Sequence, residues 1–139
     1  MTTHITSPQN PRIKAVIKLS KRRQRDLTRL TAVEGTREVA RALAQGVIPT
    51  EAYLCPDLIK AGEGEETRRA LRALGTERRT RLFTVTAEIF AKLAYRSDSG
   101  GLLIVIPYID TGLDSLPSST TPFFAVIENV EKPGNLGAI

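Results

Sequence analysis

The sequence predicts an α/β sandwich in which a largely parallel sheet carries helices on both faces. Short apolar stretches alternate along the chain with stretches whose apolar residues recur every three to four positions, which is the pattern of alternating strands and helices. The 139 residues include one cysteine, Cys55, and one histidine, His4. The core must therefore form by packing alone, because neither a disulfide framework nor a Cys/His metal cluster can be assembled, and we expect no metal site.

The first expected helix lies in the stretch from Arg12 to Arg29. The preceding SPQNP at residues 7–11 supplies start signals, with Asn10 as the N-cap before Pro11. Apolar residues then recur at helical spacing, from Ile13 through Val16 and Ile17. Such a helix packs one apolar stripe inward and turns its cations toward solvent.

The remaining elements of this domain alternate. Gly35 and Thr36 turn the first strand into the next helix, Gly46 closes that helix, and Thr86 caps the last one. Strands are expected over Leu30–Glu34, Glu51–Cys55, Arg81–Val85 and Gly101–Ile106, and helices over Arg37–Gln45, Glu63–Leu74 and Ala87–Leu93.

Residues 108–122 lose hydrophobic periodicity and are rich in Ser, Thr, Pro, Asp and Gly, as an interdomain linker is. The sequence thus predicts one domain over residues 1–107, a linker over 108–122 and the start of a second domain over 123–139. In the last segment, Phe123–Ile127 is expected to be a buried strand. Pro133 and Gly134 then predict a tight turn, and Asn135 caps a helix of which only the first residues remain. We expect the chain to be the front part of a larger protein.

Positive charge is concentrated near the N-terminus. The chain carries a net charge of +5, and the stretch from Arg12 to Arg29 exceeds this by itself, since only Asp26 opposes its cations. Those cations are Arg12, Lys14, Lys18, Lys21, Arg22, Arg23, Arg25 and Arg29. Unpaired Lys and Arg in such a run are typical of a surface that binds a phosphate backbone, and the prevalence of Arg suits bidentate phosphate contacts and stacking on unpaired bases. A solvated basic face is the alternative.

Two further features limit the kind of partner. No Phe, Tyr or Trp occurs before Tyr53, so the aromatic platform of an RNA-recognition-motif sheet is absent and a binding surface here would be helical and charged. A second basic group, from Arg68 to Arg81, is interleaved with glutamates and is expected to be an ion-paired, solvated face. The sequence has neither a membrane-length apolar run nor a signal peptide, so we expect a cytoplasmic protein with no membrane partner.

Three segments together resemble the SpoU (TrmH) family of RNA ribose methyltransferases. They are ITSPQNPRIKAVIKLSKRRQRD near the start, AVEGTREV at residues 32–39, and ENVEKPGNLGAI at the end. The resemblance implies an N-terminal substrate-binding domain, a sandwich similar to kink-turn-binding ribosomal proteins, followed by the first strand of a truncated knotted α/β catalytic domain. It also implies that the full-length protein uses S-adenosylmethionine, acts on structured rRNA or tRNA, and forms a homodimer through the catalytic domain.

Carried over to this chain, the resemblance implies a catalytic-site role for Asn135, although a plain helix cap accounts equally well for that residue. In the family's first catalytic-domain motif, an arginine follows four positions after the glycine that corresponds to Gly137, which would be position 141. The motifs that hold the methyl donor in the family come later still. We therefore expect this chain to bind no cofactor and to be inactive alone. The expected RNA-binding residues are Asn10, Arg12, Lys14, Lys18, Lys21, Arg22, Arg23, Arg25 and Arg37. Arg37 is expected to have an external partner or to pair with Glu34, while Glu34 and Gly35 fix the turn into the following helix.

The leading hypothesis is thus the RNA-recognition domain of a 2′-O-ribose methyltransferase. The alternative is a non-enzymatic RNA-binding module of the ribosomal-protein type, in which the last motif is only a strand and a cap.

Overall fold

The computed structural model describes residues 2–96, 98–109, 112–116 and 118–130. The chain divides into two compact units, Met1–Ile109 and Asp110–Ile139. Asn135, with the turn expected at Pro133 and Gly134, lies outside the described residues. The assignment of residues 123–139 to a second domain stays a prediction.

The first unit contains a five-stranded mixed sheet. Its strands have the spatial order β1-β4-β3-β5-β2, in which β4 pairs in parallel with β1 and β3, while β5 pairs antiparallel with β3 and β2. The strands are β1 (Thr2–Ile5), β2 (Leu30–Glu34), β3 (Glu51–Leu54), β4 (Arg81–Val85) and β5 (Leu102–Pro107). The prediction of a largely parallel sheet is therefore confirmed for β1, β2, β3 and β4, which run in one direction, and wrong for β5, which runs against them. Alternation of strands and helices does not fix strand direction. Here Gly100 and Gly101, with φ of 63° and 71°, turn the chain into β5 in the opposite sense.

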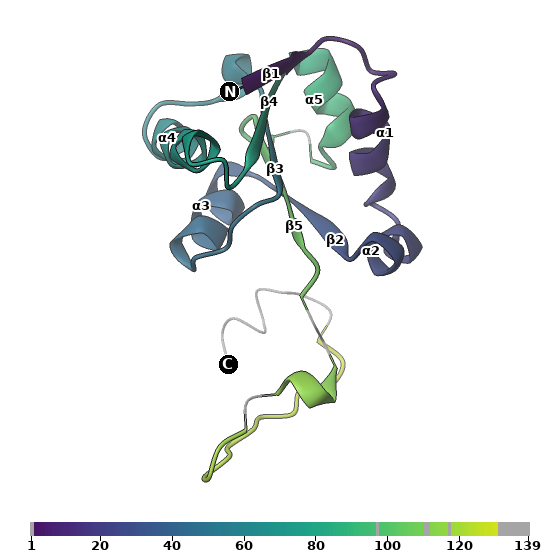
Figure 1. Cartoon of the computed structure of the whole chain (residues 1–139), viewed down its shortest axis with the longest axis vertical. Helices are drawn as coiled ribbons and strands as arrows, with labels where there is room; N and C mark the ends of the chain where they lie inside the picture. The colour runs from purple at the N-terminus through teal and green to yellow at the C-terminus, as the bar shows by residue number, and fades with distance from the viewer. Residues whose placement is uncertain (1, 97, 110–111, 117, 131–139) are drawn as a thin grey trace. The chain divides into compact units, whose positions relative to one another are not determined.

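Helices cover both faces of this sheet. The helices are α1 (Pro11–Lys18), α2 (Arg22–Thr28), α3 (Thr36–Ala44), α4 (Glu63–Thr76) and α5 (Ala87–Leu93). Figure 1 shows the sheet nearly edge-on, with α1 and α5 on one side and α3 and α4 on the other. Each face has its own apolar core. Ile13 and Phe90 pack against Phe83 on the first face, and Val39 and Leu71 pack against Ile104 on the second.

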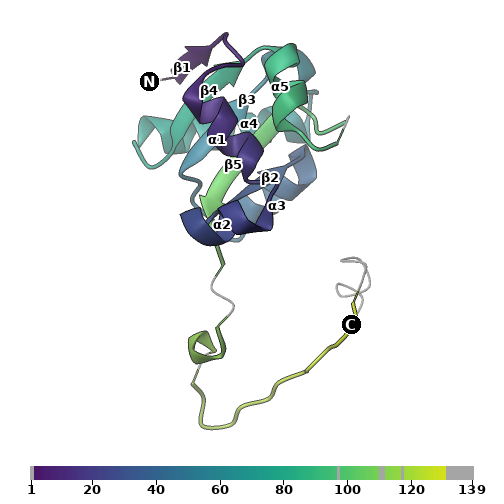
Figure 2. The same cartoon turned by 90° about the vertical axis from the view of Figure 1, so that its right-hand side faces the viewer.

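The basic stretch forms two helices rather than one. After α1, Lys21 has an extended backbone, with φ of −91° and ψ of 126°, and serves as the N-cap of α2. The Ser20 hydroxyl donates to the Ile17 carbonyl at 2.8 Å, which satisfies an acceptor at the end of α1. Leu19, between the two helices, is buried in the core below α1. Figure 2 shows α1 and α2 in front of the sheet with their axes in different directions, and α2 contacts β2.

The predicted caps are confirmed where they are described. The Asn10 side chain accepts a hydrogen bond from the backbone N–H of Arg12 at 2.9 Å, and the Thr86 hydroxyl accepts one from Ile89 N–H at 3.4 Å. Gly35, with φ of 105°, turns β2 into α3, a conformation that residues with a Cβ rarely adopt.

The strand expected at Phe123–Ile127 is not formed. These residues have no regular secondary structure, and their side chains are exposed. A strand needs a neighbour to accept and donate its backbone hydrogen bonds, and within the described part of the chain none pairs with this segment. Of the described helices, none combines the length and apolar character that crossing a membrane requires.

Candidate nucleic-acid interface

Four cations of the α1–α2 segment are exposed and unpartnered. Among the described residues, Lys14 and Lys18 on α1, Lys21 between the helices and Arg23 on α2 make no ion pair and no side-chain hydrogen bond. Arg22 lies 3.7 Å from Asp26, and the two side chains are 84% and 50% exposed, so water competes effectively with this contact. These five residues, which we call the basic helix surface, can meet phosphate groups without losing a strong internal partner.

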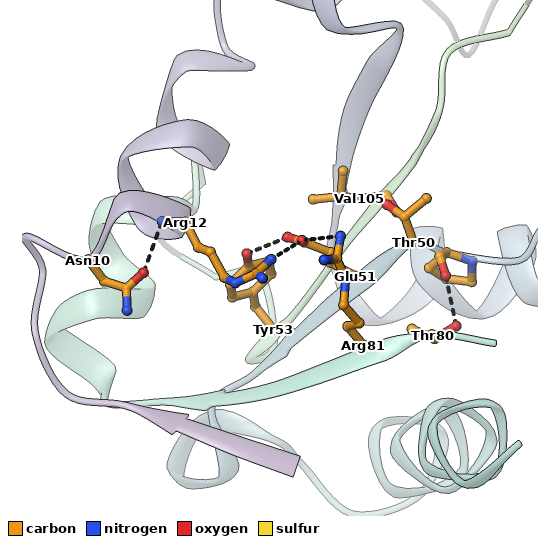
Figure 3. A network of polar contacts seen from close by, with 9 residues as sticks. Asn10, Arg12, Thr50, Glu51, Tyr53, Thr80, Arg81 and Val105 are labelled. Atoms are coloured by element: carbon orange, nitrogen blue, oxygen red, sulfur yellow. Dashed lines mark hydrogen bonds and ion pairs between the residues drawn. The ribbon is translucent and has the colours of Figure 1, made fainter. Parts of the chain in front are cut away.

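Arg12, by contrast, belongs to an internal ion-pair network. Its Nη1 lies 2.6 Å from Oε1 of Glu51, which also pairs with Arg81 at 2.9 Å (Figure 3). The Tyr53 hydroxyl donates to the other oxygen of Glu51 at 2.6 Å. The Glu51 side chain is only 13% exposed, so its charge depends on these partners. The Arg12 guanidinium also lies over the Phe83 ring, 5.0 Å from its centre.

This network joins the start of α1 to β3 and β4. Burial, together with the hydrogen bond to Glu51 and its negative charge, raises the pKa of the Tyr53 hydroxyl far above its usual value. Tyr53 thus stays a neutral donor under all ordinary conditions. The arrangement gives Arg12 a structural role in fixing α1, and its predicted contact with RNA stays a prediction.

Arg25 closes the end of α1. Its Nη1 donates to the carbonyls of Leu19 and Ser20, both at 2.9 Å. Carbonyls at the end of a helix have no partner within the helix, and a cation there also interacts favourably with the helix dipole. Arg25 therefore holds the corner between α1 and α2, whereas Arg23, two residues earlier, has no partner in the part of the chain that the structure describes.

Arg37 lies at the start of α3, exposed and without an ion pair among the described residues. Its expected pairing with Glu34 is not formed. The Glu34 carboxylate instead accepts two backbone hydrogen bonds, from Tyr95 N–H at 2.6 Å and Arg96 N–H at 2.8 Å. The Arg96 side chain pairs with Glu38 at 3.0 Å. Arg37 is thus available to an external partner.

Sequence reasoning missed the anchoring of the turn after α5. Residues 95 and 96 are fixed by carboxylates from β2 and α3, about sixty residues earlier in the chain. The only signal in the sequence was the polar, loop-like composition of this turn. An open groove of about 580 Å³ lies beside it, lined on one side by Lys60 and Ile59 and on the other by Ala91 and Tyr95.

The second basic group contains the expected ion pairs only in part, because Arg69, Arg72 and Arg78 are exposed and make no ion pair among the described residues. Arg68 pairs with Glu65 at 2.7 Å on α4, and Arg79 lies 3.6 Å from Glu77. Neither His4, which is 2.8 Å from the Thr84 hydroxyl, nor buried Cys55 belongs to a cluster of metal-binding side chains, and the described residues contain no such cluster.

Comparison with known proteins identifies the class. Residues 10–103 match the family model of the MRM3-like substrate binding domain. A solved RNA 2′-O-ribose methyltransferase is 32% identical in sequence, with a TM-score of 0.71 over 98% of this chain. The chain therefore belongs to the SpoU family of RNA 2′-O-ribose methyltransferases, and the matched region is a substrate-binding domain.

More distant solved structures share the fold. An rRNA methyltransferase from Sinorhizobium meliloti is 20% identical over 83% of this chain, with a TM-score of 0.63. The SpoU methyltransferase AviRb from Streptomyces viridochromogenes, in complex with AdoMet, is 17% identical over 80%, also with a TM-score of 0.63. The chain spans 49% of the first structure and 40% of each of the other two. A comparison with curated proteins gives no significant match.

Proposed function

We propose that this chain is the RNA-binding part of an S-adenosylmethionine-dependent 2′-O-ribose methyltransferase that acts on structured rRNA or tRNA. The observation that carries the proposal is the basic helix surface, a set of exposed cations with no strong internal partner, within a region that matches a substrate-binding domain. Each cation placed against a phosphate releases condensed counterions, which favours binding.

In this proposal the predicted RNA-binding residues have two kinds of role. Lys14, Lys18, Lys21, Arg22 and Arg23 meet phosphates directly, and Arg37 adds a contact at the start of α3. Asn10, Arg12 and Arg25 act through the protein, because they hold the start and the end of α1 in place. The direct contacts set the affinity for RNA, and the internal ones set the position of the surface that makes them.

AviRb and a second structure of the Sinorhizobium meliloti enzyme contain AdoMet, which supports the proposal that the complete protein uses S-adenosylmethionine as its methyl donor. Asn135 is proposed to help shape the catalytic site, and the complete protein is proposed to be a homodimer. Methyl transfer requires the ribose hydroxyl to lie in line with the sulfonium methyl group and to lose its proton. A domain that fixes the RNA contributes to the first requirement, so binding here bears on the rate as well as on affinity.

The test is binding of this chain to a structured ribosomal RNA fragment and to duplex DNA of equal length across a salt series. The variant Lys18→Glu/Arg23→Glu reverses two charges on the basic helix surface. The matched control, Arg69→Glu/Arg72→Glu, makes the same charge change on α4, which covers the opposite face of the sheet.

We expect the wild-type chain to prefer RNA. The first variant should bind more weakly, with a salt dependence shallower by about 0.7 to 0.9 per lost contact on a double-logarithmic plot. The control should keep the wild-type slope. Equal losses in both variants would show general electrostatic attraction and refute the assigned surface. Methyl transfer to a ribose by the complete protein would separate the enzyme from a non-enzymatic RNA-binding module.

A further inference from the structure

We propose that Tyr95 is a stacking platform for an unpaired nucleobase of the bound RNA. This inference rests on the proposed function and adds a subsite outside the basic helix surface. Tyr95 is 95% exposed, and among the described residues neither its ring nor its hydroxyl has a hydrogen-bond, ring or cation partner. It therefore contributes almost nothing to the core of this unit.

The backbone beneath Tyr95 is held far more firmly than a plain connecting turn requires. The two oxygens of Glu34 accept from the N–H groups of Tyr95 and Arg96 at 2.6 and 2.8 Å. Arg96 is tied in addition to Glu38, 3.0 Å away on α3. Charge-assisted hydrogen bonds of this length are strong, and together they join the turn to β2 and α3. An exposed aromatic ring on a fixed backbone loses little entropy when it stacks on a ligand.

Tyr95 also lines two grooves. One groove, of about 450 Å³, extends from Tyr95 to Ile17, Ser20 and Arg25 at the end of α1. The other, of about 580 Å³, extends toward Asp57 and Lys60. The first groove connects the ring with the corner between α1 and α2, which lies next to the basic helix surface in the chain. An RNA that lays its phosphates along α1 and α2 can thus bring a neighbouring loop nucleotide to Tyr95.

The chemistry of the site selects an unpaired base over a duplex. A paired base has both of its faces covered by its neighbours in the stack, whereas a splayed loop base offers a free face to an aromatic ring. Stacking requires no particular hydrogen-bond pattern, so every base is accepted and the strength follows the size of its ring system. We therefore assign this subsite to an unpaired base, with purines favoured.

The test uses the full chain and an RNA hairpin whose loop contains unpaired adenines, one of them replaced by 2-aminopurine. The fully paired form of the same RNA is the reference. Variants are Tyr95→Ala, Tyr95→Phe and, as a matched control for loss of an exposed apolar side chain, Leu27→Ala on α2, where Leu27 is 73% exposed. Thermal unfolding of each variant verifies that the fold is intact.

We expect Tyr95→Ala to weaken hairpin binding about 5- to 150-fold, as loss of one stacked base does, and to abolish quenching of the 2-aminopurine fluorescence. Its salt dependence should equal that of the wild type, because no charge is removed. Tyr95→Phe and Leu27→Ala should bind like the wild type, and affinity for the paired RNA should be unchanged in all variants.

Wild-type hairpin affinity and quenching in Tyr95→Ala would overturn the subsite and leave the proposed function intact. An equal loss of hairpin and paired RNA binding would also overturn it, because the ring would then support the surface rather than stack on a base. Failure of the wild-type chain to bind either RNA would overturn the proposed function and the subsite together.

Discussion

The same substitution to alanine is expected to affect stability at Arg25 and RNA affinity at Arg23. Both are arginines of α2, two residues apart, and each change to alanine removes one positive charge. Arg25 donates to two carbonyls at the end of α1, both at 2.9 Å, whereas Arg23 has no partner among the described residues. Arg25→Ala should therefore lower stability, and Arg23→Ala should lower only the affinity for RNA.

The size of the effect follows from the contacts. Two charge-assisted hydrogen bonds at a half-buried site contribute about 1–2 kcal/mol after allowance for water that replaces the guanidinium. For a unit of this size, a loss of 1 kcal/mol in the free energy of unfolding lowers the melting temperature by about 4.4 °C. The melting temperature of Arg25→Ala should therefore lie about 4–9 °C below that of the wild type. Arg23→Ala should melt within about 2 °C of it, since exposed substitutions rarely change stability.

Scanning calorimetry of the three proteins in one buffer gives the comparison, and RNA titration of the same samples gives the affinity. Equal melting temperatures for Arg25→Ala and Arg23→Ala would refute the assignment of Arg25 to the corner between α1 and α2. Arg25→Lys is the second variant. It keeps the charge but cannot reach both carbonyls with one planar group, so it should recover only part of the lost stability.

Three further substitutions test the internal contacts. Glu51→Gln removes the charge that Arg12 shares and should cost about 1–3 kcal/mol in denaturant unfolding, a value reduced by the exposure of its partners. Glu66→Gln, at an exposed position in the first turn of α4, should cost less than about 1 kcal/mol. Gly35→Ala forces a Cβ into φ of 105° and against the Glu38 carboxylate, which should cost about 1–3 kcal/mol by the same method. The pKa of Glu38 is lowered below 4.5 by a hydrogen bond from its own backbone N–H and then by Arg96. Its stabilising contribution is therefore present above pH 4.5 and lost as the pH falls through the lowered pKa, so the difference in melting temperature between wild type and Glu38→Gln should be full at pH 7 and shrink progressively below pH 4.5.

The sequence predicted most elements of the first unit because their signals are local. The bounds of β2, β4 and α5 agree with the predicted strands Leu30–Glu34 and Arg81–Val85 and helix Ala87–Leu93. Each of these has its own apolar pattern or cap. The edge strand β1 was missed because, of its four residues, only Ile5 is buried, and so it has no hydrophobic pattern. The direction of β5 depends on pairing with β3 and β2, which no local pattern encodes.

In the candidate site, too, contacts between residues close in the sequence could be predicted and contacts between distant residues could not. Asn10 was found as a cap because its partner is two residues away. The partner of Arg12 is Glu51, 39 residues away, and that of the turn at Tyr95 is Glu34, 61 residues away. A count of basic residues along the chain cannot separate cations with such partners from free ones. The distinction needs the folded chain.

That distinction determines which cations an RNA can use. If Arg12 turned to a phosphate, it would leave the Glu51 carboxylate, only 13% exposed, with Arg81 as its one remaining cation. The Tyr53 hydroxyl would also remain, so the loss is one short ion pair to a nearly buried carboxylate, which contributes more than one exposed phosphate contact returns. Arg12 is therefore expected to stay in its network when RNA binds, so that α1 keeps its position on the sheet. The salt dependence of binding then reports the free cations of the basic helix surface and Arg37, rather than every basic residue between positions 12 and 29.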